Sequence, residues 1–475
     1  MAEKAKKAEK GRQRMAIRRN DLGRDPIGKL VLRLAVPSML AQFVSVLYSI
    51  VDRMYIGNIP EIGDTALAGV GVCGPIVTLI NSFALLIGIG GAPLAAIRMG
   101  EKNLEGAKQI LANCFLMLLG IAAFLTTFFL CLKDPLLMTF GASEATFGYA
   151  EQYLTICVSG TVFAIMATGL NQFIICQGFS GMAMISVMIG AAMNIALDPV
   201  FIFVFGMGVR GAAIATVLSQ MASFLFVVGF LKSSRAVLRL GFGGYSFRIM
   251  RRVMTFGFSP FIISATDSVL IIVMNSVLQR YGGPENGDAF ITCATVVQSY
   301  MQLITMPMAG ITGGTQPILS FNYGAGNTAR IRKAFWRIIF LCAGFTTIMF
   351  CISQTCSSLF VGLFTKDTSL TELSVWGIRT FTLGIIPLAF QYEIVDGFTA
   401  LGIARIAVTL SLTRKILYLI LTLVLPIFFS APGAFYAEPA VDIFCGILAT
   451  VTFLLNFNTL MRRRDEMPEG QTLYS

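Results

Sequence analysis

Histidine is absent from this sequence of 475 residues. Because histidine is the commonest metal ligand and proton relay near neutral pH, its absence argues against His-based metal sites and Cys-His catalysis. The ten cysteines lie mainly in apolar stretches without the paired spacing of a zinc site, which is typical of structural thiols. Charged residues are also scarce, at 13% of the chain, a share too low for a soluble globular protein of this length.

Apolar residues make up most of the chain, with 56% hydrophobic residues and a mean hydropathy of +0.76. Runs long enough to cross a hydrocarbon core of roughly 30 Å recur along almost the whole length. They lack the alternating polarity of membrane β-strands. We therefore predict an all-α polytopic membrane protein with twelve transmembrane helices. The predicted spans begin near residues 32, 66, 109, 148, 181, 211, 256, 289, 335, 374, 405 and 434.

The basic residues are distributed unequally about these spans. Of the 36 Lys and Arg residues, 28 fall on the side of both termini, six on the other side, and Arg414 and Lys415 within a span. This is the positive-inside pattern, and it predicts that both termini are cytoplasmic. It also explains the net charge of +11 without a nucleic-acid partner. We expect basic residues 1–30 to be a cytoplasmic tail rather than a signal peptide, and residues 462–475 to be a second tail.

The two halves of the chain resemble each other at a separation of about 223 residues. Matching positions include Pro37 and Pro260, and Gly100 in "GEKN" and Gly324 in "GAGN". Six spans per half is an even number, so the repeats enter the membrane in the same direction. We predict parallel lobes at residues 31–232 and 255–461, joined by a cytoplasmic loop at 233–254. A cavity between two such lobes can be exposed to either side in turn, as in a transporter.

Asp198 lies inside the apolar stretch "NIALDPVFIF", with Asn194 one helical turn before it. A charge near mid-membrane costs about 2.5 to 3.5 kcal/mol unless it has a partner, a watery cavity or a neutral form. Asp52, Tyr153 and Thr216 fall at a comparable depth on their own spans. Because two nearby carboxylates in a low dielectric resist ionising together, these five residues predict a site that binds a proton or a cation.

Two prolines accompany these acids, Pro37 on the span of Asp52 and Pro199 beside Asp198. Each is expected to bend its helix in a way that responds to the charge of the carboxylate. A structural alternative stays open from the residues alone. Asp52 would then form a surface pair with Arg53, and Asp198 would only cap the break at Pro199.

The second half has acids within its spans, but no counterpart of the Asn194–Asp198 pair. Glu393 and Asp396 share a helix face, and we expect them to form a buried ion-pair cluster with Arg414 and Lys415. A role of Glu393 and Asp396 in transport is the alternative. The weaker candidates are Asp267 and Asp442.

The paired lobes, the "GEKNLEGAK" and "GAGNTARIRK" loops and the "NIALDP" stretch resemble the multidrug and toxic compound extrusion (MATE) family over about residues 25–460, and its bacterial multidrug export proteins in particular. The resemblance implies two six-helix bundles that expel organic cations and other drugs in exchange for H⁺ or Na⁺. It further implies a location in the bacterial inner (plasma) membrane, a drug-cavity role for Asn171 and Tyr48, and a second-lobe ion site at Asp267 and Asp396. The cation-coupling residues that it implies are Asp52, Tyr153, Asn194, Asp198 and Thr216.

We therefore predict a monomeric secondary active antiporter, not an enzyme, that exchanges H⁺ or Na⁺ for lipophilic, often cationic drugs. No cofactor is expected beyond the coupling ion, and the only metal expected is Na⁺ at Asp52 and Asp198. The abundant Phe and Met residues provide adaptable apolar surface, although most of them are expected to face lipid or the core. The alternatives are a flippase for lipid-linked precursors and a non-transporting membrane receptor or enzyme.

Overall fold

A computed structural model describes residues 20–140, 142–362 and 368–467, which are almost entirely helical. Within these ranges, eleven helices are long and apolar enough to cross a membrane, and one bent pair of shorter helices makes a twelfth span. The bend in that pair is 54°. The prediction of a polytopic all-α protein with twelve spans is confirmed.

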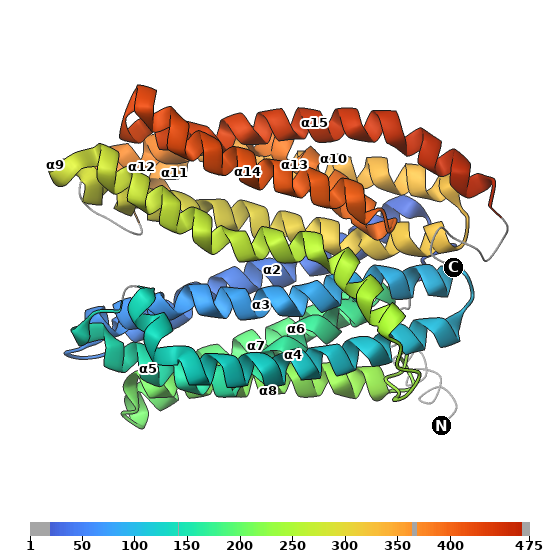
Figure 1. Ribbon diagram of the computed structural model, residues 1–475, viewed down its shortest axis with the longest axis horizontal. Coiled ribbons are helices and arrows are strands. Elements are labelled where there is room, and N and C mark those ends of the chain that lie inside the picture. The colour runs from blue at the N-terminus through green and yellow to red at the C-terminus, as the bar shows by residue number, and fades with distance from the viewer. Residues whose placement is uncertain (1–19, 141, 363–367, 468–475) are drawn as a thin grey trace, which may run out of the picture.

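The first six spans form one bundle, drawn in blue to green in Figure 1. Its bent span consists of α5 and α6, and its fifth span continues beyond α7 as a short π-helical turn, η1. The elements are α2 (Ile27–Gly57), α3 (Gly63–Gly100), α4 (Leu104–Thr139), α5 (Glu144–Ser159), α6 (Thr161–Cys176), α7 (Ser180–Pro199), η1 (Val200–Val204) and α8 (Gly208–Lys232).

The second bundle, drawn in yellow to red, begins with α9 (Phe247–Gly324). This long helix contains two spans that meet at Gly283, whose φ of 69° is a conformation that side-chain-bearing residues rarely adopt. The remaining elements are α10 (Thr328–Thr355), α11 (Ser357–Val361), α12 (Thr368–Phe381), the 3₁₀ turn η2 (Thr382–Gly384), α13 (Ile385–Ala400), α14 (Ala404–Phe429) and α15 (Ala431–Asp465).

The sequence repeat corresponds to a structural repeat at the start of α4 and α10. Asn103 accepts a hydrogen bond from the Gly106 amide at 2.8 Å, and Asn327 accepts one from the Arg330 amide at 3.2 Å. An Asn side chain at this position satisfies a backbone donor that the first helical turn leaves free. Repeat-related loops therefore begin repeat-related helices with the same cap.

The two bundles converge toward the end of the molecule where both termini lie (Figure 1). At this end α3 and α9 touch through their backbones. A β-carbon on Gly257 would overlap the carbonyl oxygen of Leu86, and one on Gly100 would overlap that of Phe321. We call these close approaches, together with that of Gly314 to the Ser38 side chain on α2, the inner seam. Only residues without a side chain allow the two bundles to approach so closely.

Residues 20–26, which we call the strap, cross this end of the molecule before α2 begins. Asn20 donates a hydrogen bond to the carbonyl of Gly178 in the first bundle at 2.9 Å. In the second bundle, Asn322 donates to the carbonyl of Leu22 at 2.9 Å, and Arg330 donates to that carbonyl at 3.1 Å. The strap therefore connects the two bundles across the inner seam.

Candidate functional site

Asp198 is fully buried near the end of α7, where its carboxylate contacts the side chain of Asn194. The Asn194 amide nitrogen donates to Asp198 Oδ1 at 3.1 Å, as expected for residues four apart on a helix. The same nitrogen lies 3.5 Å from the hydroxyl of Thr216 on α8. Two adjacent helices thus contribute three polar groups to one point inside the first bundle.

Asp52 on α2 and Tyr153 on α5 complete this cluster. The carboxylates of Asp52 and Asp198 are close enough to interact directly. Tyr153 is buried, and its hydroxyl senses the charge of Asp52. We call the five residues the first-lobe site. The residues that the sequence predicts for cation coupling thus lie on four helices of the first bundle, with Asp198 in contact with Asn194 and near Asp52, and with Tyr153 within electrostatic reach of Asp52.

Three oxygens of the first-lobe site are buried without a hydrogen-bond donor among the described residues. They are Asp52 Oδ1, Asn194 Oδ1 and Asp198 Oδ2. A buried acceptor without a partner costs on the order of 1 to 3 kcal/mol, and more when it is charged. Three such acceptors in one cluster therefore form a site that a proton or a small cation would stabilise.

The two structural alternatives for these acids do not describe the observed contacts. Among the described residues, no ion pair joins Asp52 to Arg53, whose side chain is exposed. The Asp198 carboxylate accepts from Asn194 one turn earlier, and the residue that caps α7 is Val200. Both acids therefore face the inside of the bundle, where they meet each other.

The predicted helix-bending prolines lie at distinct places. Pro37 lies inside α2, about four turns before Asp52. Pro199 is the last residue of α7 and is followed directly by η1. Because proline cannot donate a backbone hydrogen bond, a wider π-helical turn is a way to continue the chain beyond it. The backbone beside Asp198 thus departs from a regular α-helix.

The two predicted drug-cavity residues have different surroundings. Tyr48 lies one turn before Asp52 on α2, and its hydroxyl interacts electrostatically with the carboxylate of that residue. Asn171 on α6 instead contacts the first two turns of α7. It accepts from the Ser186 hydroxyl at 3.1 Å, and its own amide donates to the carbonyl of Ala183 at 3.4 Å. Its described polar contacts therefore tie α6 to α7, and none of them is with the first-lobe site.

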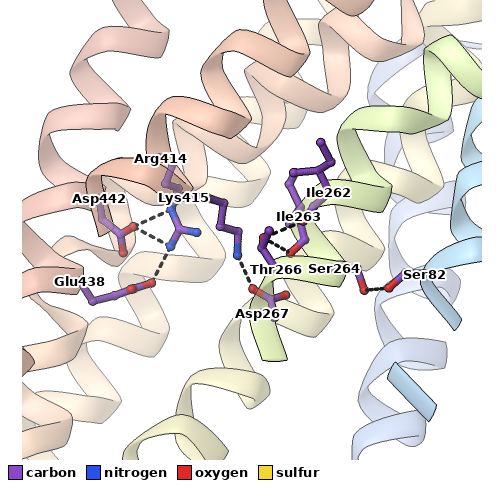
Figure 2. A network of polar contacts seen from close by, with 10 residues as sticks. All are labelled: Ser82, Ile262, Ile263, Ser264, Thr266, Asp267, Arg414, Lys415, Glu438 and Asp442. Atoms are coloured by element: carbon purple, nitrogen blue, oxygen red, sulfur yellow. Dashed lines mark hydrogen bonds and ion pairs between the residues drawn. The ribbon is translucent and has the colours of Figure 1, made fainter. Parts of the chain in front are cut away.

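The second lobe contains a different set of charges (Figure 2). Arg414 on α14 donates to Asp442 Oδ1 at 2.9 and 3.0 Å and to Glu438 Oε1 at 2.5 Å, both on α15. Lys415 pairs with Asp267 on α9, whose side chain remains about half exposed. Both cations of the membrane spans are therefore neutralised by acids.

The predicted cluster of Glu393 and Asp396 with Arg414 and Lys415 is wrong. Consecutive residues on a helix point about 100° apart, so Arg414 faces α15 while Lys415 faces α9. Neither cation is paired with α13. The spacing of four between Glu438 and Asp442 was a usable signal, since it places both acids on one face of α15.

In α13, Glu393 is buried and Asp396 is half-buried, and neither forms an ion pair with a described residue. Asp396 accepts a hydrogen bond from the Thr312 hydroxyl on α9 at 2.5 Å. Glu393 is 1% exposed, and its Oε1 has no donor among the described residues. The sequence offered no signal for Thr312, because it lies among glycines and small residues in "AGITGGTQP". The two acids form a second carboxyl cluster, which is separate from the pair of Asp267 with Lys415.

The part of the chain that the structure describes contains no group of side chains suited to hold a catalytic metal ion. No three His, Cys, Asp or Glu side chains gather there as a metal site would need. The first-lobe site offers carboxylate, amide and hydroxyl oxygens, which suit hard monovalent or divalent cations and protons better than transition metals.

Comparison with known proteins places this geometry in a family. The MatE family model matches residues 37–200 and 261–425, one segment in each bundle. The multidrug export protein MepA of Staphylococcus aureus (strain MRSA252) is 22% identical over 94% of this chain and 98% of its own length. The MepA protein of Staphylococcus saprophyticus is 23% identical over 93% and 97%.

Solved structures share the same architecture. One described as the outward-facing conformation of a multidrug resistance MATE family transporter of the MOP superfamily superposes with a TM-score of 0.86 at 21% identity, covering 93% of this chain and 98% of that chain. A Pyrococcus furiosus transporter of the MOP superfamily, described as having a binding pocket of reverse polarity, gives the same TM-score and coverage at 22% identity. The predicted fold of two six-helix lobes is confirmed.

Proposed function

Since the chain belongs to the MatE family, we propose that it is a secondary active exporter that exchanges H⁺ or Na⁺ for lipophilic, often cationic drugs. The observation that carries this proposal is the group of three buried oxygens on Asp52, Asn194 and Asp198, for which the described part of the chain supplies no hydrogen-bond donor. Such a group is stabilised when a cation binds, so its occupancy can drive a conformational change. The similarity to MepA along 94% of the chain supports drugs as the cargo.

The positive-inside pattern supports an orientation in which both termini are cytoplasmic. The inner seam and the strap then lie on the cytoplasmic side, so the described conformation is closed toward the cytoplasm. In this outward-facing state, a cation from outside reaches the first-lobe site. Cation binding neutralises the repulsion between Asp52 and Asp198 and changes the bend of α2 at Pro37 and of α7 at Pro199.

Coupling follows from competition between the drug and the cation. A bound cation favours release of the drug outward, after which the seam opens and the cation leaves toward the cytoplasm. Every step is a binding event or a movement of one lobe against the other, so no covalent chemistry is required. The carboxylates of Asp52 and Asp198 hold the cation, and the bends of α2 and α7 transmit its binding to the lobes.

Charge balance favours cationic over anionic cargo. Arg414 and Lys415 of α14 are neutralised by Glu438, Asp442 and Asp267. The acids of the first-lobe site form no ion pair with a basic residue among the described residues. A lipid-linked pyrophosphate would be repelled by such a surface, which disfavours the flippase alternative.

The test is transport in inside-out membrane vesicles. Uptake of a fluorescent organic cation is measured under an imposed proton gradient and, separately, under a sodium gradient. We expect wild type to accumulate the probe under one of them. Gradient-driven uptake by Asp198→Asn and by Asp52→Asn should be at least tenfold lower than uptake by wild type. This corresponds to a loss of about 1.4 kcal/mol or more of coupling free energy.

The matched control is Asp134→Asn, which makes the same chemical change at an exposed acid on α4 and should keep full activity. Full accumulation by Asp198→Asn would show that the first-lobe site does not couple the ion. No gradient-driven uptake by wild type with any of a panel of cationic probes would overturn the exporter assignment itself.

A further inference from the structure

A groove outside the first-lobe site lies between the start of α2 and the first half of α10. Its volume is about 710 Å³. One wall is formed by Gly28, Val31 and Leu32 of α2. The other wall belongs to α10 and consists of Arg332, Lys333, Trp336, Arg337, Phe340 and Leu341. From this arrangement we infer that the groove binds the headgroup phosphate and upper acyl chain of an anionic phospholipid.

The groove is strongly cationic because three of its nine lining residues are basic and none is acidic. Lys333 and Arg337 make no hydrogen bond or ion pair with any described residue, and both side chains are exposed. Arg332 is held by a neutral partner, the Asn458 side chain at 2.6 Å, and so keeps its charge. Three cations that share one hollow and lack an acid form a site for an anion.

The groove has a basic level and an apolar level, in the same order as the headgroup and acyl chains of a phospholipid. Lys333 and Arg337 lie one helical turn apart on α10, and Phe340 and Leu341 follow one turn deeper. Trp336 lies at the level of the cations and is 45% exposed, as interfacial tryptophans often are. A headgroup phosphate would meet the basic level, while an acyl chain would follow Phe340 and the exposed Leu32.

A glycine contributes to the shape of the hollow. A β-carbon on Gly28 would lie 2.5 Å from Arg337 Nη1, so the absence of a side chain there lets the guanidinium reach across to α2. A larger residue at position 28 would fill this end of the groove without changing any charge. The groove can therefore be narrowed without removing a charge, although the guanidinium of Arg337 must move aside.

The same place in the first lobe is filled by protein. The repeat partners of Lys333 and Arg337 are the neutral residues Gln109 and Asn113. Asn113 donates to the carbonyl of Gly244 at 3.1 Å and accepts from the Ser246 amide at 2.9 Å, both in the loop between the lobes. A smaller cavity of about 170 Å³ remains beside Gln109, and its lining includes Arg252 and Arg98, of which Arg98 forms an ion pair with Glu101. The inter-lobe loop thus covers the face of α4 that corresponds to the groove. The groove at α10 has no such cover from the described residues and is basic.

Charge complementarity selects the occupant. The N-terminal residues 1–19 carry eight Lys and Arg against two Glu, so like charge disfavours their entry into a basic groove. The groove opens at the membrane-facing side of α10, beside the exposed Phe340, where anionic lipids of the cytoplasmic leaflet are the available anions. The measurement does not depend on the proposed function, because lipid binding is followed without a gradient or a drug.

The two tryptophans of the chain make a direct test possible, since only Trp336 lies in the groove. In a Trp376→Phe background, Trp336 is the only indole. Its quenching is measured in vesicles containing brominated phosphatidylglycerol or brominated phosphatidylcholine. We expect stronger quenching by the anionic lipid. In Lys333→Gln/Arg337→Gln the preference should fall about fivefold for each cation removed, following roughly 1 kcal/mol per basic residue.

The matched control is Arg248→Gln/Arg251→Gln, which removes two exposed cations of the same face outside the groove and should keep the preference. Gly28→Leu should reduce quenching by both lipids, because it fills the groove. Equal quenching by the two lipids in wild type would overturn the inference, as would an unchanged preference in Lys333→Gln/Arg337→Gln. Loss of the preference in 20 mM inorganic phosphate would identify a site for free anions instead. A preference that appears only after removal of residues 468–475 would assign the groove to that segment.

Discussion

The inner seam should tolerate no side chain at Gly257, and we expect Gly257→Ala to shift the protein toward the conformation that is open to the cytoplasm. The added methyl group would overlap the carbonyl oxygen of Leu86 on α3. Because that oxygen belongs to the backbone, no rotamer change relieves the overlap, and the helices must separate.

Overpacking of this kind costs roughly 1 to 3 kcal/mol, and here the cost applies only to the state in which the seam is closed. The higher helix propensity of Ala acts in both states and cancels between them. The equilibrium between the two conformations should therefore move roughly 5- to 150-fold toward the open state.

The assay is the alkylation rate of a reporter cysteine in inside-out vesicles. Ala96→Cys places it on α3, fully buried at the seam, in a chain whose three exposed cysteines, Cys131, Cys351 and Cys356, are replaced by serine. A membrane-impermeant maleimide should label it at least fivefold faster with Gly257→Ala. Gly313→Ala is the control, because its β-carbon would meet nothing within 4 Å. Equal labelling of the two variants would refute the reasoning.

Two further outcomes are expected. Arg414→Met should lower the free energy of unfolding by about 3 to 5 kcal/mol, since it leaves two acids of α15 buried without their cation, whereas Lys415→Met should cost less than about 1 kcal/mol because Asp267 is half exposed. Thermal unfolding of both variants in one detergent measures the difference, and similar losses would contradict this assignment. Arg330→Gln should release the strap and speed tryptic cleavage after Arg24 several-fold, whereas an unchanged rate would mean that its hydrogen bonds do not hold the strap.

The spans and the lobes were predictable because each depends on a property of single segments. A helix in lipid must satisfy its own backbone and present about 20 apolar residues, so its existence is encoded locally. The repeat could be found by comparing the halves, and the identical caps at Asn103 and Asn327 are its structural counterpart. The first-lobe site was predictable in the same way, since burying Asp198 in an apolar run demands a nearby partner.

The partners of the second-lobe charges could not be read in this way. The positions of Arg414 and Lys415 along α14 were known, but the rotation of α14 about its axis was not. That rotation decides whether a side chain meets α13, α15 or α9, and it is set by the packing of all three neighbours. Thr312, the hydrogen-bond donor to Asp396, could not be predicted for the same reason, because nothing in its local sequence indicates which helix it faces.

The sequence by itself therefore determined which segments cross the membrane, that they form two related sets, and which acids must find partners. These are consequences of local hydropathy and of the cost of an isolated charge in oil. Only the tertiary structure decided which charges meet, that glycines close the seam between α3 and α9, and that a loop covers the groove of one lobe and leaves that of the other open. Such features depend on the mutual rotation and separation of helices distant in the chain, which no single segment specifies.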